Sequence, residues 1–195
     1  MGCIGGIIFG IIQFAAIVLI AVGTPLGMIQ PSEEKALNLD NKYCITMWGI
    51  KNNCLRLSYA YKPPEVWSKC SGRDSRFKAA QVCAIAAAIV FAVSFVLSFL
   101  MSCCCPCIPY VCMVLNFVAM IIVTVCWACM LDCYLRTMGS DTTSYPGQDV
   151  CVKLKDFHGT DGTYANGMHL GTGFILIIIG WALGLVNIFV LLIPC

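Results

Sequence analysis

Formal charge is scarce in this sequence, and its scarcity excludes an ordinary soluble domain. Only 11% of the 195 residues are charged, whereas soluble domains carry roughly 25%. Every Asp, Glu, Lys and Arg lies between residues 33 and 78 or between residues 132 and 161. A chain this short cannot bury its other stretches in a soluble core, so we expect them to lie in a lipid bilayer.

Other absences narrow the range of functions. The sequence has no basic stripe and no basic–aromatic motif, so nucleic acid is not an expected partner. Its two histidines, His158 and His169, are isolated from each other in the sequence. Neither is expected to bind a metal, and no cofactor is indicated. No acidic or basic side chain falls at mid-membrane, which disfavours a transport path through the spans.

Uncharged runs of about 20 residues predict four membrane-spanning segments. Their expected bounds are about 4–29, 79–101, 108–131 and 168–193. We expect helices, because lipid cannot satisfy the hydrogen-bonding groups of the backbone. The first run also resembles a signal peptide with a cleavage site at Ala21-Val22-Gly23. It lacks a basic start and exceeds the usual apolar length, so we predict that it is retained.

The orientation in the membrane rests on two signals that conflict. The charged loops, about 30–78 and 132–167, share one side, and both termini share the other. Nine of the lysines and arginines lie in the first loop and three in the second, which by the positive-inside rule would make the loops cytoplasmic. Spaced cysteines in polar loops suit an oxidising compartment. We give the cysteines more weight and expect extracellular loops with cytoplasmic N- and C-termini.

Cysteines also gather on the face opposite the loops. Juxtamembrane cysteines are the usual substrates of reversible palmitoylation, which is cytoplasmic. A soft-metal site is disfavoured, because closely consecutive thiolates cannot easily form a closed tetrahedron. We therefore predict lipidation at Cys3, Cys103, Cys104, Cys105, Cys107 and Cys195.

A C-x-x-C motif suggests an alternative function. Cys126 and Cys129 lie on one helical face at the loop end of the third span, with Cys133 beyond them. This layout resembles that of membrane thiol oxidoreductases, which need a thiol of lowered pKa. No basic or histidine neighbour is evident in the sequence, and free cysteine otherwise packs as a small hydrophobe. We keep the oxidoreductase as an alternative to a non-enzymatic role.

Small and polar residues within the spans predict helix packing. Gly6 and Gly10 are four residues apart, a spacing that lets helices approach closely. We favour packing within one chain over a homo-oligomer, which stays open. The amides Gln13, Asn116 and Asn187 are expected to form interhelical hydrogen bonds.

The first loop has strand character. Residues 43–48 are β-branched and aromatic, and residues 55–61 alternate between apolar and polar, with Gly49 as a turn signal between them. Two strands alone are marginally stable. A Cys44–Cys54 disulfide closes a loop of about ten residues and would add about 2–3 kcal/mol.

Further residues in the loops and at the loop end of the third span are assigned roles on their own chemistry. We expect a Cys133–Cys151 disulfide, with Cys70 as the rival partner or a free thiol. Lys51 is expected to be a solvated turn charge. Asp132 and Arg136 are spaced for an i,i+4 ion pair that ends the third span. Trp48 and Trp67 are expected to support structure rather than to contact a ligand.

Residues 44–54, with the sequence Cys-Ile-Thr-Met-Trp-Gly-Ile-Lys-Asn-Asn-Cys, resemble the signature of the amastins, surface proteins of trypanosomatid parasites. At position 51 that signature takes a basic residue or glutamine. Met47 replaces its leucine or phenylalanine and keeps an apolar side chain. The matching signature residues include Cys44, Thr46, Trp48, Gly49, Lys51 and Cys54.

The resemblance implies a multi-pass plasma-membrane protein that acts at the host–parasite boundary. Amastins are similar to claudins, so it also implies an all-α membrane protein whose four-helix bundle carries a small extracellular, disulfide-stapled β-sheet. We expect one such domain over residues 1–195, in contact with the bilayer and with a host membrane or protein partner. A claudin-like pore or barrier is a further alternative. Amastins are often described as glycoproteins, but no Asn-x-Ser/Thr sequon occurs here.

Overall fold

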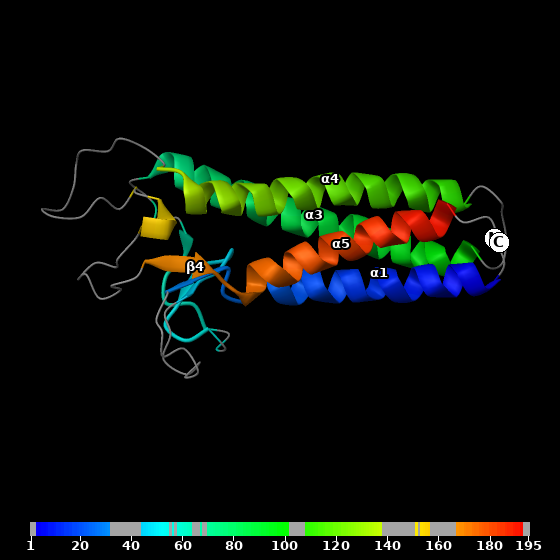
Figure 1. The fold of residues 1–195 in the computed structure, drawn as a ribbon, viewed down its shortest axis with the longest axis horizontal. Helices are drawn as coiled ribbons and strands as arrows, with labels where there is room; N and C mark the ends of the chain where they lie inside the picture. The colour runs from blue at the N-terminus through cyan, green and yellow to red at the C-terminus, as the bar shows by residue number, and fades with distance from the viewer. Residues whose placement is uncertain are drawn as a thin grey trace, which may run out of the picture.

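The structure is a computed structural model of the chain. Among the residues that it describes, four helices are long and apolar enough to cross a membrane, as the sequence predicts. They form an elongated bundle that carries a small sheet at one end (Figure 1). The described residues are 3–31, 44–54, 56, 58–63, 67, 70–101, 108–137, 151, 153–156 and 167–192.

The bundle pairs the first helix with the last and the two middle helices with each other. Helix α3 packs most extensively on α4, and α1 on α5. Helix α1 begins, and α5 ends, at the end of the bundle opposite the sheet (Figure 1). The bounds are Cys3–Gly23 for α1, Ser71–Met101 for α3, Ile108–Leu135 for α4 and Thr172–Leu192 for α5.

Two helices are shorter than the apolar runs that contain them. Helix α1 ends at Gly23 rather than near residue 29. The Thr24 hydroxyl donates to the Ala21 carbonyl at 3.2 Å, and Pro25 then disfavours a helical conformation before it. Helix α5 begins at Thr172 because residues 168–170 form a strand. Buried strands are as apolar as membrane helices, so hydropathy alone could not separate them.

Helix α3 is longer than predicted and begins at Ser71 rather than at residue 79. Its additional turns carry charged side chains. Asp74 lies in the first turn, where a carboxylate interacts favourably with the helix dipole. Lys78 pairs with Asp74 at 2.6 Å. The charges mark the part of α3 that extends beyond the apolar span.

The sheet joins segments that are distant in the sequence. Its strand order is β3-β2-β1-β4, with antiparallel neighbours. Ile29 of β1 lies opposite both Ile45 of β2 and Leu170 of β4. The sheet therefore connects the start of the first loop to the end of the second. The bounds are Ile29–Pro31 for β1, Cys44–Ile45 for β2, Ile50–Lys51 for β3 and Met168–Leu170 for β4.

The predicted strands in the first loop are corrected by the structure. Of the strand expected at 43–48, Tyr43 lies outside the described residues and residues 44–45 form β2, while residues 46–49 form a turn into β3. In the segment predicted at 55–61, Leu55 and Leu57 lie outside the described residues. Of the others, Tyr61 forms an isolated bridge with Ile50. A short segment therefore lies alongside β3 without extending the sheet as a full strand.

One hydrophobic core runs from the bundle into the sheet. The inward side chains Met28, Ile45 and Met47 are buried in the same cluster as Phe77 of α3 and Met130 of α4. The sheet thus packs directly on the helices.

Candidate functional site

The hairpin of β2 and β3 is organised around Thr46. Its hydroxyl accepts hydrogen bonds from the backbone N–H groups of Trp48 and Gly49, at 3.2 and 3.1 Å, and donates to the Gly49 carbonyl at 2.7 Å. A serine or threonine side chain closes a turn in this way. The signature threonine therefore holds the turn in place, and the hairpin is the element that the motif encodes.

Gly49 is required by a close approach of the chain. It has a φ of 156°, and a Cβ here would lie 2.5 Å from the Tyr61 carbonyl oxygen. The Tyr59 ring lies beside the same position, 3.1 Å from that Cβ. A side chain at residue 49 would push the 59–61 segment away from β3.

Lys51 is buried, which corrects the prediction of a solvated turn charge. The residue is 2% exposed, and its Nζ donates to the Pro25 carbonyl at 2.7 Å. The ammonium also lies 4.9 Å from the centre of the Tyr59 ring, within cation–π range. Burial lowers the pKa of Lys51 from its usual 10.5. The side chain links β3 to the turn that follows α1.

The middle helices are also bonded to the sheet. Gln81 of α3 donates from Nε2 to the Met47 carbonyl at 2.8 Å. Tyr134 of α4 donates its hydroxyl to the Met168 carbonyl at 3.1 Å. These bonds fix the hairpin turn and β4 to neighbouring helices.

Helix α5 is held through its own first turn. The Gly173 N–H donates to the Gly27 carbonyl at 3.0 Å, and the Gly171 N–H donates to the Met28 carbonyl at 2.7 Å. A Cβ at Gly171 would collide with the Gly27 oxygen. Helices α3, α4 and α5 are thus hydrogen-bonded to the sheet or to its flanking turns, and α1 is linked to it through the turn at Pro25.

Two disulfides lie at the sheet end. Cys44 and Cys54 are joined with a Cα–Cα distance of 5.6 Å, and they brace the signature hairpin. Cys70 and Cys151 are joined at 5.7 Å. The second bond ties the start of α3 to the second loop, just before the short helix η2 at Leu154–Asp156.

The expected Cys133–Cys151 disulfide is wrong. Cys133 is a free thiol that is fully buried within the core on α4. Its helical position turns it inward, whereas Cys70 lies at the loop end of α3. Cys151 therefore pairs with the rival that the sequence analysis left open.

Trp67 forms part of the packing between loop and bundle. Its ring stacks on Phe77 with centroids 6.0 Å apart, and the Arg73 guanidinium lies 4.6 Å from the ring centre. Trp67 and Arg73 are both buried, while Trp48 is partly buried against the core. Trp67 thus packs in the core of the loop end, and Trp48 contacts that core from its surface.

An ion network joins α3 and α4 at the loop end. Arg136 Nε lies 3.0 Å from Asp132 Oδ1, which confirms the predicted i,i+4 pair. Arg76 of α3 binds the other oxygen of the same carboxylate. This second contact crosses between helices, so the sequence spacing gave no signal for it.

The polar amides within the spans bond between helices, as predicted. Asn187 of α5 donates to Gln13 Oε1 on α1 at 2.6 Å, and Gln13 donates to the Phe91 carbonyl on α3 at 3.4 Å. Asn116 of α4 donates to the Gly184 carbonyl on α5 at 3.0 Å. The three amides are fully buried.

The C-x-x-C cysteines are free thiols on α4. Cys126 is buried in the core, and Cys129 is partly buried. Arg76, in the charged turns at the loop end of α3, lies within electrostatic range of Cys129 and binds the Asp132 carboxylate. Within the described ranges, no group of three or more His, Cys, Asp and Glu side chains could hold a metal ion.

Of the predicted lipidation sites, Cys3 is the first residue of α1. The remaining sites, Cys103, Cys104, Cys105, Cys107 and Cys195, lie outside the described residues.

Apolar helices of membrane-crossing length, with a sheet packed and bonded to one end of their bundle, define a multi-pass membrane protein. A family model described as Amastin surface glycoprotein matches residues 14–191, which is most of the chain and includes the signature hairpin. The protein therefore belongs to the amastin surface glycoprotein family. Neither the curated proteins nor the solved structures contain a match to it.

Proposed function

We propose that this protein is a non-enzymatic protein of the plasma membrane, with cytoplasmic termini and extracellular loops. The sheet would make contact at the host–parasite boundary, with a facing membrane as its partner. The observation that carries this proposal is that the sheet packs on the bundle and is hydrogen-bonded to α3, α4 and the first turn of α5. A module held in this way can transmit contact to the membrane without losing its shape.

A contact patch on this module supports the proposal. We define it as Arg56, Tyr59 and Tyr61, which are exposed in the segment beside β3. The two tyrosines flank Gly49, and Tyr61 is 55% exposed. Tyrosine and arginine are enriched at protein contacts and at membrane interfaces. The buried Lys51 beneath Tyr59 keeps this ring in place.

The orientation is tested with a membrane-impermeant amine reagent on intact cells. All lysines lie in the two loops or at the loop end of α3, so peptide mass spectrometry should find Lys62 and Lys153 modified. Disulfides at the sheet end favour this outcome, because they persist in oxidising compartments. Labelling of these lysines only after permeabilisation would support the positive-inside alternative and refute the proposed orientation.

The contact function is tested with cells that display the full chain. Fluorescent vesicles of phosphatidylcholine, phosphatidylserine and cholesterol should bind to these cells above the level of untransfected cells. The double variant Tyr59→Ala/Tyr61→Ala should lose this binding at equal surface expression. Tyr110→Ala is the matched control, because Tyr110 is 70% exposed at the other end of the bundle. Equal binding by all three proteins would contradict the role of the patch.

A thiol oxidoreductase is the second candidate, and the C-x-x-C motif of free cysteines on α4 is the observation that suggests it. Arg76 lies near Cys129 but binds the Asp132 carboxylate, so its charge is already paired and does not single out a thiolate. If this function holds, purified protein should oxidise or exchange a dithiol substrate, and Cys126→Ser/Cys129→Ser should abolish that activity. A claudin-like pore would instead give conductance in reconstituted bilayers.

A further inference from the structure

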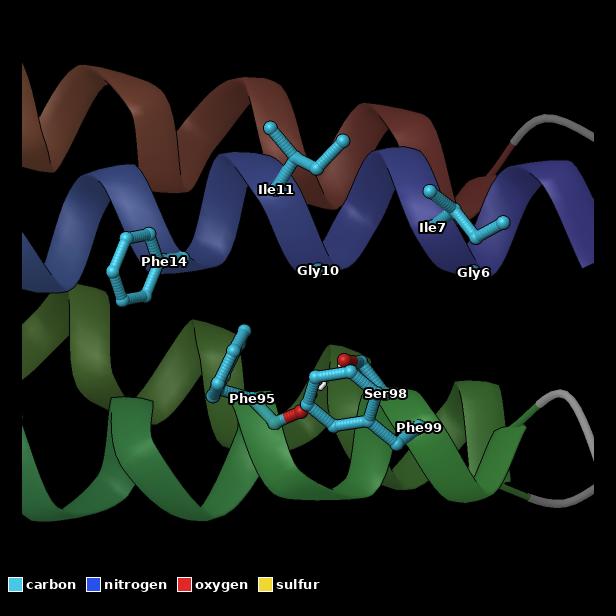
Figure 2. Close-up of a pocket in the computed structure, with 8 residues that line it drawn as sticks. All are labelled: Gly6, Ile7, Gly10, Ile11, Phe14, Phe95, Ser98 and Phe99. Atoms are coloured by element: carbon cyan, nitrogen blue, oxygen red, sulfur yellow. Dashed lines mark hydrogen bonds between the residues drawn. The ribbon is translucent and has the colours of Figure 1, made fainter.

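A groove of about 510 Å³ runs between α1 and α3, in the half of the bundle away from the sheet (Figure 2). We call it the α1–α3 groove. It is separate from the contact patch, the disulfides and the C-x-x-C motif. Its central lining residues are Gly6, Gly10, Phe14, Phe95, Ser98 and Phe99.

The shape of the groove follows from small residues at its floor and rings at one end. A Cβ at Gly10 would lie 3.1 Å from Ser98 Oγ, so the helices approach closely there. The rings of Phe14 and Phe95, with centroids 5.7 Å apart, bound the end nearer the sheet. Gly6 lines the opposite end, where α1 begins (Figure 2). The groove is thus bounded toward the sheet and extends toward the termini.

The chemistry of the lining selects a hydrocarbon. Ser98 supplies the polar group of the lining, and its hydroxyl donates to the Phe95 carbonyl at 2.6 Å within its own helix. No lining residue is charged. Exposed side chains of Ile7 and Ile11 form the rim. An occupant therefore gains apolar contacts and is offered no charged partner.

The length of the groove fits one leaflet of a bilayer. Gly6 and Phe14 are eight positions apart on α1, which corresponds to about 12 Å along a helix. Half of the hydrocarbon core is about 15 Å thick. A single acyl chain that enters from the membrane surface near the start of α1 would run along the groove to the phenylalanine pair.

A tethering point for such a chain lies in the same helical register. Cys3 is the first residue of α1. With 3.6 residues per turn, its position around the helix axis is within about 20° of those of Gly10 and Phe14. A chain attached at residue 3 therefore starts in line with the groove. We propose that the α1–α3 groove holds the acyl chain of S-acylated Cys3.

The modification is a simple acyl transfer from a long-chain acyl-coenzyme A. The Cys3 sulfur forms a thioester bond with the acyl carbon, and the bond between that carbon and the coenzyme A sulfur breaks. The thiol proton passes to the coenzyme A thiolate, so nothing is oxidised or reduced. This inference rests on the proposed orientation in one respect, because acyl-coenzyme A is cytoplasmic and must reach Cys3.

The test uses cells that express the full chain and are fed a palmitate analogue carrying a diazirine and an alkyne. An acyl-exchange assay at Cys3 reports the modification. Ultraviolet light then crosslinks the diazirine of the bound acyl chain to the residues that surround it. Peptide mass spectrometry should find crosslinks from the Cys3 chain to residues 95–99 of the same molecule. Cys3→Ser should reduce these crosslinks to background.

Two matched variants separate groove occupancy from acylation itself. Gly6→Leu should fill part of the groove, so acylation of Cys3 should persist while crosslinks to residues 95–99 fall. Ala21→Leu adds the same side chain at an exposed position near the other end of α1 and should leave both signals unchanged. A variant with serine at the other five predicted lipidation sites should retain the crosslinks.

Several results would overturn the inference. Crosslinks spread evenly over all lipid-facing helices would place the chain outside the groove. Crosslinks that persist in Cys3→Ser would show that a free lipid, rather than the tethered chain, occupies it, and crosslinks to a second copy would show an interface. Absence of acylation at Cys3 would also refute the inference. In that case an impermeant maleimide on intact cells shows whether Cys3 is extracellular. Labelling of Cys3 would mean that the proposed orientation fails as well, and no labelling would mean that the acylation inference alone fails.

Discussion

The environment of Lys51 explains why one position of the signature takes either a basic residue or glutamine. Both side chains are long and end in an N–H donor, and the Pro25 carbonyl requires such a donor. A residue that seemed to be a surface charge is therefore a link between the hairpin and α1.

Replacement of this donor should destabilise the protein. Lys51→Met keeps the apolar stem but leaves a buried carbonyl unbonded, which typically costs about 1–3 kcal/mol. Lys51→Gln should cost less, because its amide can still donate. Thermal unfolding in detergent, followed by tryptophan fluorescence, measures both effects.

Lys78→Met is the control for this series. Lys78 is paired with Asp74 at the surface, and such exposed i,i+4 pairs contribute only about 0.3–0.5 kcal/mol. If Lys51→Met unfolded at the same temperature as Lys78→Met, the buried hydrogen bond would not have the importance assigned to it.

At the scale of elements, the two disulfides should differ in strength. Cys70–Cys151 closes a sequence separation of 81 and Cys44–Cys54 one of 10. By loop entropy, the longer loop is worth about 4.5 kcal/mol and the shorter about 2.7 kcal/mol. Cys70→Ser/Cys151→Ser should therefore lower the melting temperature more than Cys44→Ser/Cys54→Ser.

The pairing itself can be checked without reduction. Non-reducing peptide mass spectrometry should recover Cys70 linked to Cys151. Cys133 should react with an alkylating agent once the protein is denatured, because it is a free thiol. Recovery of a Cys133–Cys151 peptide would show that the assigned connectivity is incorrect.

The sequence predicts the elements whose signals are local. Uncharged runs locate the spans, and the spacing of Asp132 and Arg136 is sufficient for their ion pair. Strands β1 and β4 escape detection, because they lie inside apolar runs next to α1 and α5.

The partners of Cys151 and Lys51 depend on contacts between distant segments. Cysteine spacing does not encode disulfide connectivity, so the sequence favoured Cys133 as the partner of Cys151 and left Cys70 as the rival, whereas the inward position of Cys133 on α4 decides for Cys70. A lysine beside a glycine turn is usually solvated, and the approach of Pro25 that buries Lys51 leaves no local pattern. The candidate site was thus located by its motif, and its Cys44–Cys54 disulfide was predicted, but its hydrogen bonds to distant segments were not predictable.

At the scale of the whole molecule, buried amides hold the bundle together. Asn187 links α5 to α1 through Gln13. Asn187→Leu should lower the stability by about 0.6–2 kcal/mol, the range for hydrogen bonds between membrane helices. Unfolding in mixed detergent and denaturant measures this change. Val186→Leu, at a neighbouring lipid-exposed position, should be nearly neutral, and an equal loss in both variants would argue against the amide link.

The neighbouring positions of α1 and α5 have a consequence for biosynthesis. Helix α1 is synthesised before α5 but packs on it, and β1 pairs with β4, so α1 and β1 cannot complete their contacts until α5 has been made. Until then, the Gln13 amide lacks its partner from α5. A nascent or truncated chain would thus present an unsatisfied amide to lipid, a polar group in the bilayer by which cellular quality control could recognise unfinished molecules.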